Sequence, residues 1–381
     1  MDAKPLLLFS RGGDDAEFRY ASGFSVEQGL YARFGAGDDL LVVSALELDR
    51  ARAEGRAAQV ADRADLGWQD GRDLLGSWAE IGARVLTDRG AAGARTSALV
   101  PAGLAESLRE TGVDVELDRA LFVTERRRKS ADEVSWIARA QSAAEAACRV
   151  VIGDLGAARP DAEGWLVLDG RPLTSERLLA RCQAVLQEHG CASSETIIAG
   201  SPECAMPHFR GAGRIRAGQP VIIDIFPRHL STGYHGDMTR TVVPGRPSDQ
   251  VARMHAACVA ALDAGVALLR PGADGGDVHR GVCQALVDQG FGTTTRGLEG
   301  PAGGPRMIHS TGHGVGLDVH EAPNLRDVSY PLEVGDVVTV EPGLYEGGLG
   351  GVRVEDLLVV TDGGCRNVTT LPRSLDPADY L

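Results

Sequence analysis

The cysteines of this 381-residue chain do not occur at the spacings of a disulfide framework or of a thiolate zinc site. There are seven of them, an odd number, and no two are separated by only two residues. Cysteines without such spacing are free thiols that pack as small apolar side chains. We therefore expect all seven to be free and buried.

Long apolar runs and an excess of basic residues are also missing. No run approaches the roughly 20 residues of a membrane helix, and the N-terminal LLLF is shorter than the about 7 to 15 residues of a signal-peptide core. We expect a cytoplasmic protein with no membrane partner. The 53 acidic residues outnumber the 39 basic ones, for a net charge of -14. This balance argues against a nucleic-acid partner, because phosphate binding draws on clustered Lys and Arg. The one basic block, Arg126–Lys129, is expected to be a solvated linker.

Three common catalytic signatures are absent from the sequence. There is no GxSxG, no phosphate-binding loop ending in GKS or GKT, and no GxGxxG after a strand-like run. Serine hydrolase, nucleotide-binding and dinucleotide-binding functions are therefore disfavoured. Residues 1–123 also lack histidine, so chemistry that needs imidazole must lie further along the chain.

The chain is long enough for two domains, and the sequence indicates a boundary near Thr124. Residues 1–124 alternate short apolar runs with Ala- and Arg-rich helical stretches, which is typical of a small α/β domain. Residues 125–381 open on a charged run, followed by the capping box Ser130 with Glu133 in front of a long helical pattern.

Residues 125–381 are expected to form an α+β domain with an antiparallel sheet flanked by helices. The expected elements after the first helix are helices over about 175–189, 249–269 and 276–289, and strand pairs 221–226 with 238–243 and 337–341 with 352–360.

Four acidic residues lie on or beside these apolar strands. Asp224 and Asp237 belong to the first strand pair, and Glu341 and Glu355 belong to the second. If they converge, each close pair repels by about 4 kcal/mol at about 4 Å under an effective dielectric of about 20. Protons or cations must neutralise such a cluster. Two divalent ions would balance four carboxylates, and oxygen-rich ligation with one imidazole suits Mn, Fe, Co or Zn.

The motifs around these acids closely resemble the pita-bread metallopeptidases, the family of methionine aminopeptidases, Xaa-Pro aminopeptidases and prolidases. The motifs are HSTGHGVGLDVHE from position 309, VEPGLY from 340, VRVED from 352, and the aspartate at 224 followed after twelve residues by DMTRT. The resemblance implies that Asp224, Asp237, His313, Glu341 and Glu355 bind two metal ions. By the same resemblance Asp237 and Glu355 bridge the ions, Asp224 completes one site, and His313 with Glu341 completes the other.

The resemblance also implies roles for the groups around the metals. His208 and His320 look like the family's catalytic histidines, and Glu341 is the candidate general base. His309 would line the substrate pocket, and Arg353 would belong to the substrate site while supporting the ligands. The implied nucleophile is a hydroxide held by two divalent ions, with Mn as the expected metal and Co, Zn or Fe as alternatives.

The N-terminal part points to one branch of the family. FRYASGF from position 18 and the RRRKSADEV junction from position 126 resemble a creatinase-like N-terminal domain, which methionine aminopeptidases generally lack. This branch implies hydrolysis of the Xaa-Pro bond in dipeptides or at the N-terminus of longer peptides, by a homodimer. Two alternatives remain: a catalytically altered or inactive binding protein on the same fold, and a hydrolase or lyase of small non-peptide molecules.

One spacing departs from the family pattern. Asp224 and Asp237 are 13 positions apart, whereas many members have 11. The excess is expected in the turn-like segment PRHLSTG from position 227, where a loop absorbs it without moving the acids.

The remaining histidines have no expected role at the metals. They lie on expected helices or in turns, so surface or capping roles are favoured for His189, His229, His235, His255 and His279. Glu321 beside His320 suggests a zincin motif, but HEAPN lacks the second histidine of HExxH.

Overall fold

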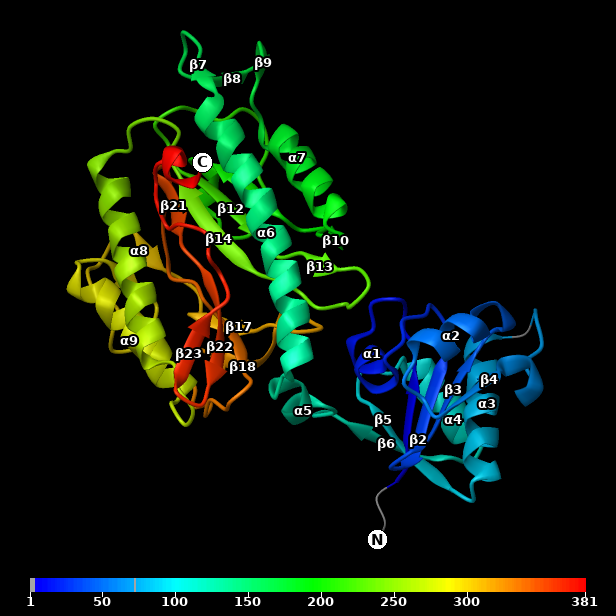
Figure 1. The fold of residues 1–381 in the computed structure, drawn as a ribbon. Helices are drawn as coiled ribbons and strands as arrows, with labels where there is room; N and C mark the ends of the chain where they lie inside the picture. Colours follow the sequence, from blue (N-terminus) through cyan, green and yellow to red (C-terminus); the bar gives the residue numbers. More distant parts are fainter. Residues whose placement is uncertain (1–3, 72) are drawn as a thin grey trace. The chain divides into compact units, whose positions relative to one another are not determined.

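The chain forms two compact units in the computed structural model, which describes residues 4–71 and 73–381. The units are Met1–Thr124 and Glu125–Leu381. Figure 1 shows that each has its own helices and strands. The border lies at the same residues as the boundary drawn from the sequence.

A six-stranded mixed sheet organises the first unit. In spatial order its strands are β4 (Gln59–Asp62), β3 (Asp38–Val43), β2 (Leu30–Gly35), β1 (Leu6–Phe9), β5 (Gly93–Ser97) and β6 (Asp114–Asp118). The helices are α1 (Ala16–Ser22), α2 (Leu48–Glu54), α3 (Leu74–Asp88) and α4 (Ala102–Glu110). Because side chains alternate along a strand, β1 contributes Leu7 and Phe9 to a core with α3 and α4, and Leu6 and Leu8 to a core with α1 and α2. This unit is the small α/β domain that the sequence predicts.

Short, mostly antiparallel sheets build the second unit. The first larger sheet contains β11 (Ile197–Gly200), β12 (Val221–Ile225) and β14 (Met238–Val242). The next contains β15 (Gly292–Thr293), β16 (Arg306–Met307), β20 (Gly343–Glu346) and β21 (Gly350–Arg353). The third contains β18 (Glu321–Leu325), β17 (Gly312–Gly314), β19 (Val337–Val340), β22 (Asp356–Thr361) and β23 (Gly364–Asn367). Two small sheets join β10 (Cys191–Ala192) to β13 (Arg228–His229), and β7 (Arg159–Pro160) and β9 (Arg171–Pro172) to β8 (Leu166–Leu168).

The helices of the second unit begin close to the positions that the sequence predicts. They are α6 (Ala131–Ala157), α7 (Ser175–Glu188), α8 (Asp249–Leu268) and α9 (Gly275–Asp288), after the short α5 (Val123–Arg127). The predicted capping box is present at the start of α6: the Ser130 N–H donates to Glu133 Oε2 at 2.8 Å, and the Glu133 N–H donates to Ser130 Oγ at 3.3 Å.

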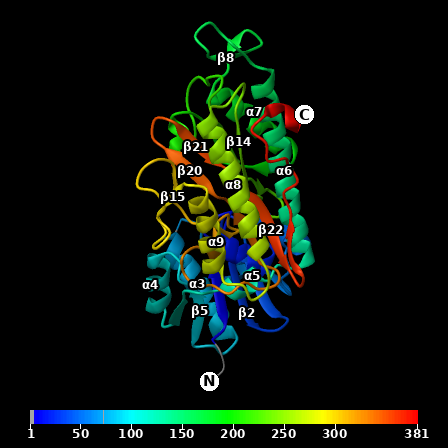
Figure 2. The ribbon, with the colours of Figure 1, turned by 90° about the vertical axis from the view of Figure 1, so that its left-hand side faces the viewer.

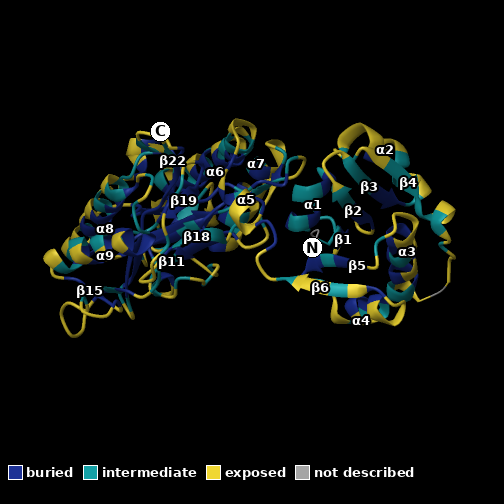
Figure 3. Ribbon diagram, turned by 90° about the horizontal axis from the view of Figure 1, so that it is seen from below, coloured by how far each residue is buried: buried dark blue, intermediate teal, exposed yellow. Residues whose placement is uncertain are grey.

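Two apolar cores fill the space between these helices and strands. One joins α6 and α7 to β12 and β14, and the other joins α8 and α9 to β19, β20, β21 and β22. In Figure 1 the two helix pairs lie on opposite sides of the strands, and Figure 2 shows α8 and α9 in front of them. In Figure 3 the labelled strand β19 is buried, whereas α8 and α9 also carry exposed residues. The predicted α+β class is confirmed.

Among the described residues, α8 alone is long and apolar enough to cross a membrane by length and composition. Val251, Met254, Cys258 and Leu262 of this helix are all buried in the core with α9 and the strands. The helix therefore has the contacts of a core helix.

The basic block Arg126–Lys129 is not the solvated linker that the sequence suggested. Arg127 is buried, and its guanidinium donates to both oxygens of the fully buried Asp336, at 2.9 and 2.7 Å. Lys129 is also buried and pairs with Glu321. Only Arg128 is largely exposed, and it pairs with Glu333. A run of like charges is usually exposed to solvent. Here acidic side chains from later in the sequence, those of Glu321, Glu333 and Asp336, form ion pairs with it.

Gly236 lets the β12–β14 connection lie directly on α6. A Cβ at this position would lie 2.5 Å from the backbone nitrogen of Gln141 and 2.7 Å from the carbonyl carbon of Ala140. We expect Gly236→Ala to lower the free energy of unfolding of the metal-free protein by about 1–3 kcal/mol, because helix backbone cannot move aside. Urea unfolding measures this. Gly347→Ala is the matched control, since nothing lies within 4 Å of a Cβ there; equal losses in both variants would contradict the prediction.

Candidate metal centre

The first pair of acids comes from the hairpin of β12 and β14. These strands pair antiparallel without a register shift, with Asp224 opposite Thr239. Asp237 directly precedes β14. Residues two apart on an extended chain point to the same face, so Asp237, Thr239 and Asp224 share one side of the hairpin. The connection between the strands includes β13, which pairs with β10. The strands themselves contain no bulge, and that the two extra residues fall in this connection stays a prediction.

The second pair of acids lies where the chain changes sheets. Glu341 stands between β19 and β20, and Glu355 stands between β21 and β22. The flanking registers, Val340 with Asp356 and Gly343 with Arg353, bring these two breaks opposite each other. The predicted single strand 352–360 is therefore two strands, because the chain turns at Glu355 to place its carboxylate inward.

The fifth predicted ligand, His313, reaches the acids from β17. This strand approaches β19 closely, and a Cβ on Gly312 would lie 2.0 Å from the carbonyl oxygen of Thr339. The His313 N–H donates to Thr339 Oγ1 at 3.1 Å. Glycine at 312 therefore permits the approach that carries the imidazole to the acids.

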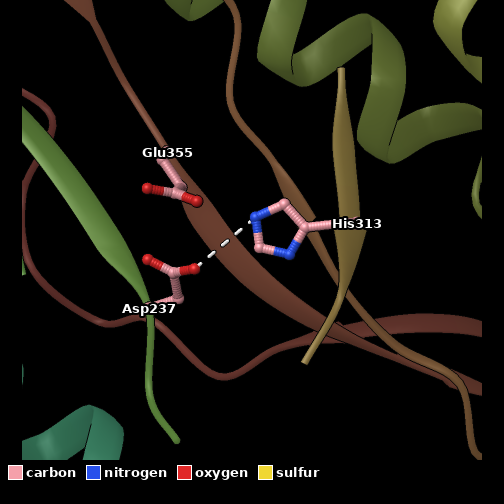
Figure 4. Close-up of side chains that lie close together, drawn as sticks. All are labelled: Asp237, His313 and Glu355. Atoms are coloured by element: carbon pink, nitrogen blue, oxygen red, sulfur yellow. Dashed lines mark ion pairs between the residues drawn. The ribbon is translucent and has the colours of Figure 1, made fainter. Parts of the chain in front are cut away.

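Side chains of Asp237, His313 and Glu355 converge in Figure 4. One ligand atom from each lies within 4.8 Å of the other two. His313 Nε2 is 3.7 Å from Asp237 Oδ2 and 3.4 Å from Glu341 Oε1. The charge of Asp224 contributes to the raised pKa values of Asp237, Glu341 and Glu355. The fold thus brings all five predicted ligands to one place.

Burial and mutual repulsion change the protonation of these acids. Burial is the first cause of the raised pKa of Asp237, of Glu355, and of Glu341, whose pKa rises to about 8. For Asp237 the charges of Asp224 and Glu341 follow, and for Glu355 the charge of Asp237. Without cations this cluster would hold protons at neutral pH.

The protonation of His313 provides a test of whether the site fits a metal. Burial lowers its pKa to about 4, so the ring is neutral at pH 7. Nδ1 lies 3.2 Å from the carbonyl oxygen of Gly314 and donates to it, which leaves the Nε2 lone pair facing Asp237 and Glu341. A lone pair facing carboxylate oxygens is unfavourable unless a cation or a proton lies between them. The donor set therefore fits oxygen-preferring divalent metals.

Several supporting side chains were missed by the sequence analysis. Thr239 Oγ1 donates to Glu355 Oε2 at 2.7 Å, and Thr339 Oγ1 donates to Glu341 Oε1 at 3.3 Å. Each threonine stands two positions from a ligand on a strand, so the alternation of strand side chains could have found them. The side-chain oxygen of Gln141 on α6 accepts a hydrogen bond from the Asp237 N–H at 2.8 Å. No pattern in the sequence indicated this contact.

Arg353 supports a ligand and does not line a substrate surface, which corrects part of its predicted role. The side chain is 4% exposed. Nη2 donates to Asp224 Oδ2 at 2.6 Å, Nη1 donates to the Tyr345 hydroxyl at 2.8 Å, and Nε donates to Thr239 at 3.2 Å. The guanidinium therefore fixes Asp224 and balances one of the clustered negative charges.

The Tyr345 hydroxyl extends this network to His309. His309 Nδ1 lies 2.8 Å from its neighbour's carbonyl, that of Ser310, and Nε2 lies 2.9 Å from the Tyr345 hydroxyl. Nδ1 therefore carries the proton, and Tyr345 donates to Nε2 while it accepts from Arg353. Both ring nitrogens of His309 are engaged, so it can present only ring carbons to a substrate.

His208 and His320, predicted to be catalytic, lie near the same centre. The rings of His320 and His313 are edge to face, with centroids 4.2 Å apart. Partial burial of its ring lowers the pKa of His320, and the charge of His208 lowers it further. Both side chains are exposed, so both can meet a ligand from solvent.

Two of the remaining histidines are not at the surface as predicted. His255 and His279 are buried. His279 bonds Thr311 at 2.9 Å and Thr295 at 2.8 Å, which explains how a buried imidazole is tolerated on an apolar helix face.

Fold and site together define a metalloprotein of the pita-bread class. The model of metallopeptidase family M24 matches residues 135–362, and the chain belongs to this family. The resemblance noted in the sequence is thereby confirmed, and membership implies divalent metal ions.

Relatives and solved structures agree with this assignment. The chain is 36% identical over 186 residues to the uncharacterized peptidase YqhT of Bacillus subtilis, covering 48% of this chain and 49% of the relative. It is 33% identical over 183 residues to the Xaa-Pro dipeptidase of Pyrococcus furiosus, covering 48% of this chain and 49% of the relative. The matches span about half the length of these curated relatives. A structure of the Xaa-Pro dipeptidase from Bacillus anthracis has the same fold, with a TM-score of 0.79 and 23% identity, covering 98% of this chain and 94% of that one.

The raised carboxyl pKa values predict how the stability of the metal-free protein depends on pH. Glu341 favours the folded state below its ordinary pKa, and that contribution is lost as the pH rises through about 8. Burial lowers the pKa values of His309 and His313 to about 4. These two groups therefore make the folded state more stable as the pH rises, but only below about pH 6.5. Between about pH 7 and about pH 8.5, the free energy of unfolding should fall by about 1 kcal/mol from Glu341 alone.

Chemical denaturation with a chelator at the two pH values measures this loss. The metal-loaded protein is the control and should show little of it, because bound cations keep the carboxylates ionised. Equal pH dependence with and without metal would contradict the assigned cluster.

Proposed function

We propose that this protein is a metal-dependent peptidase that hydrolyses the bond between a residue and a following proline. The observation that carries the proposal is the convergence of Asp237, His313 and Glu355 at metal-binding distance in a chain of family M24. Relatives named Xaa-Pro dipeptidase and Xaa-Pro aminopeptidase support proline-containing substrates.

The five ligands have the composition that two divalent ions require. Four carboxylates balance the charge of two such ions, and a neutral imidazole adds a fifth donor. When bound, two ions lower the pKa of a shared water toward roughly 7, which supplies hydroxide at neutral pH. Asp237 and Glu355 would be shared between the ions, since one ligand atom of each lies within 4.8 Å of the other and of a His313 ring nitrogen.

Glu341 is the proposed proton carrier. Burial raises its pKa to about 8 in the absence of metal, and Thr339 holds one of its oxygens. In our proposal its carboxylate accepts the proton of the attacking water and delivers it to the leaving nitrogen of proline. His320 and His208 donate hydrogen bonds to the oxygen of the scissile carbonyl as negative charge develops there.

Ligand and catalytic variants should separate metal binding from turnover. We expect Asp237→Asn to lose both ions, because a neutral amide at a bridging position leaves the remaining acids unable to hold them. We expect His320→Ala to keep its metal and to lower kcat by about 10²–10³-fold, the usual cost of removing one oxyanion donor. Metal analysis by mass spectrometry and steady-state kinetics measure the two effects. Equal metal loss in both variants would contradict the assigned roles.

A panel of Xaa-Pro dipeptides, Xaa-Pro-Yaa peptides and matched peptides without proline tests the substrate class. Cleavage of the proline peptides alone supports the proposal, and the better substrate distinguishes a dipeptidase from an aminopeptidase. Two bound ions with no peptide cleaved would favour a binding protein or an enzyme acting on small molecules. Manganese as the metal, the homodimer and the cytoplasmic location stay predictions.

A further inference from the structure

Glu321 carries a buried carboxylate held by two cations from the basic block. Its side chain is 9% exposed, that of Lys129 is 1% exposed and that of Arg126 is 12% exposed. Lys129 Nζ lies 2.6 Å from Glu321 Oε1, and Arg126 Nη2 pairs with the other oxygen. Removing three charged groups from water costs several kcal/mol per ion, and apolar replacements are often no less stable. Stability alone therefore does not account for this cluster.

The carboxylate lies inside the connection between β17 and β18. These strands pair Gly314 with Glu321, so residues 315–320 form a tight loop. A Cβ on Gly316 would lie 2.5 Å from Glu321 Oε1. Arg126 also donates to Asp318 Oδ2 at 2.7 Å. The ion cluster thus holds the loop from within as well as at its end.

This loop joins two parts of the metal centre. It begins two residues after His313 and ends on His320, whose ring stands 4.2 Å from that of His313. The carbonyl of Gly316 accepts a hydrogen bond from the backbone N–H of His235 at 2.8 Å. His235 lies two residues before Asp237. The backbone of His320 is next to the anchored Glu321. Its exposed ring has no hydrogen bond among those described.

We propose that Glu321, clamped by Arg126 and Lys129, is a positioning residue that holds His320 against the metal centre. A group that donates to a developing charge must stay within about 0.5 Å of its working position. The His320 side chain is exposed and makes no hydrogen bond among those described, so we infer that its backbone supplies this precision. Arg126 and Lys129, at the junction of α5 and α6, fix this backbone by binding the buried carboxylate of Glu321.

The kinetic part of the test rests on the proposed function. We expect Glu321→Gln and Lys129→Met to lower kcat by about 10- to 100-fold, the scale of a 1 Å misplacement, with KM and metal content nearly unchanged. Lys129→Arg keeps the charge and should recover most of the rate. Arg128→Met is the matched control: it removes a cation from the same run, but Arg128 is 63% exposed and, among the described residues, pairs with Glu333 alone.

Hydrogen–deuterium exchange gives a readout that does not need turnover. In the metal-free and metal-loaded proteins, residues 315–321 should exchange at least about tenfold faster in Glu321→Gln and Lys129→Met than in the wild type, because the loop opens when its anchor is lost. Arg128→Met and Lys129→Arg should match the wild type.

The possible results separate this inference from the proposed function. Faster exchange confined to the loop supports the inference even if no peptide is cleaved, in which case only the proposed function fails. Unchanged exchange in both clamp variants overturns the inference, as does an equal loss of metal and rate. If Glu321→Gln does not fold, the comparison of Lys129→Met with Lys129→Arg decides the question.

Discussion

The mutual repulsion of buried carboxylates is the constraint on which the second unit depends. Asp224, Asp237 and Glu355 are each less than one-tenth exposed, and together with Glu341 they share one site. A chain folds around such a cluster only if cations or protons neutralise it. Thr239, Thr339 and Arg353 donate hydrogen bonds to these acids. The bonds fix the orientation of the carboxylates around one site.

The support of the site comes from parts of the chain far from its ligands. Gln141 on α6 holds the backbone at Asp237, and Arg126 and Lys129 hold the loop that ends on His320. Gly236 and Gly312 let strands and helix approach closely enough for these contacts. The metal centre is thus a product of the packing between α6 and three separate sheets.

Much of this organisation could be read from the sequence. Apolar periodicity and the capping box at Ser130 predict the helices, because both signals are local. The β12–β14 pair was also predicted, since its turn residues stand between two apolar runs. The break of the last predicted strand at Glu355 was not, because strand patterns do not show where a chain crosses between sheets. The burial of His255 and His279 was missed for a similar reason, since their partners lie on other elements.

The sequence by itself determined which residues can bind metal, because carboxylate and imidazole chemistry belongs to the residue types and their motifs mark them. Only the tertiary structure decided what surrounds them. It turned Arg353 from a substrate contact into a support for Asp224, occupied both nitrogens of His309, and buried Lys129 of the basic block beside Glu321. These outcomes depend on which distant side chains meet in a low-dielectric interior, and no local pattern encodes that meeting.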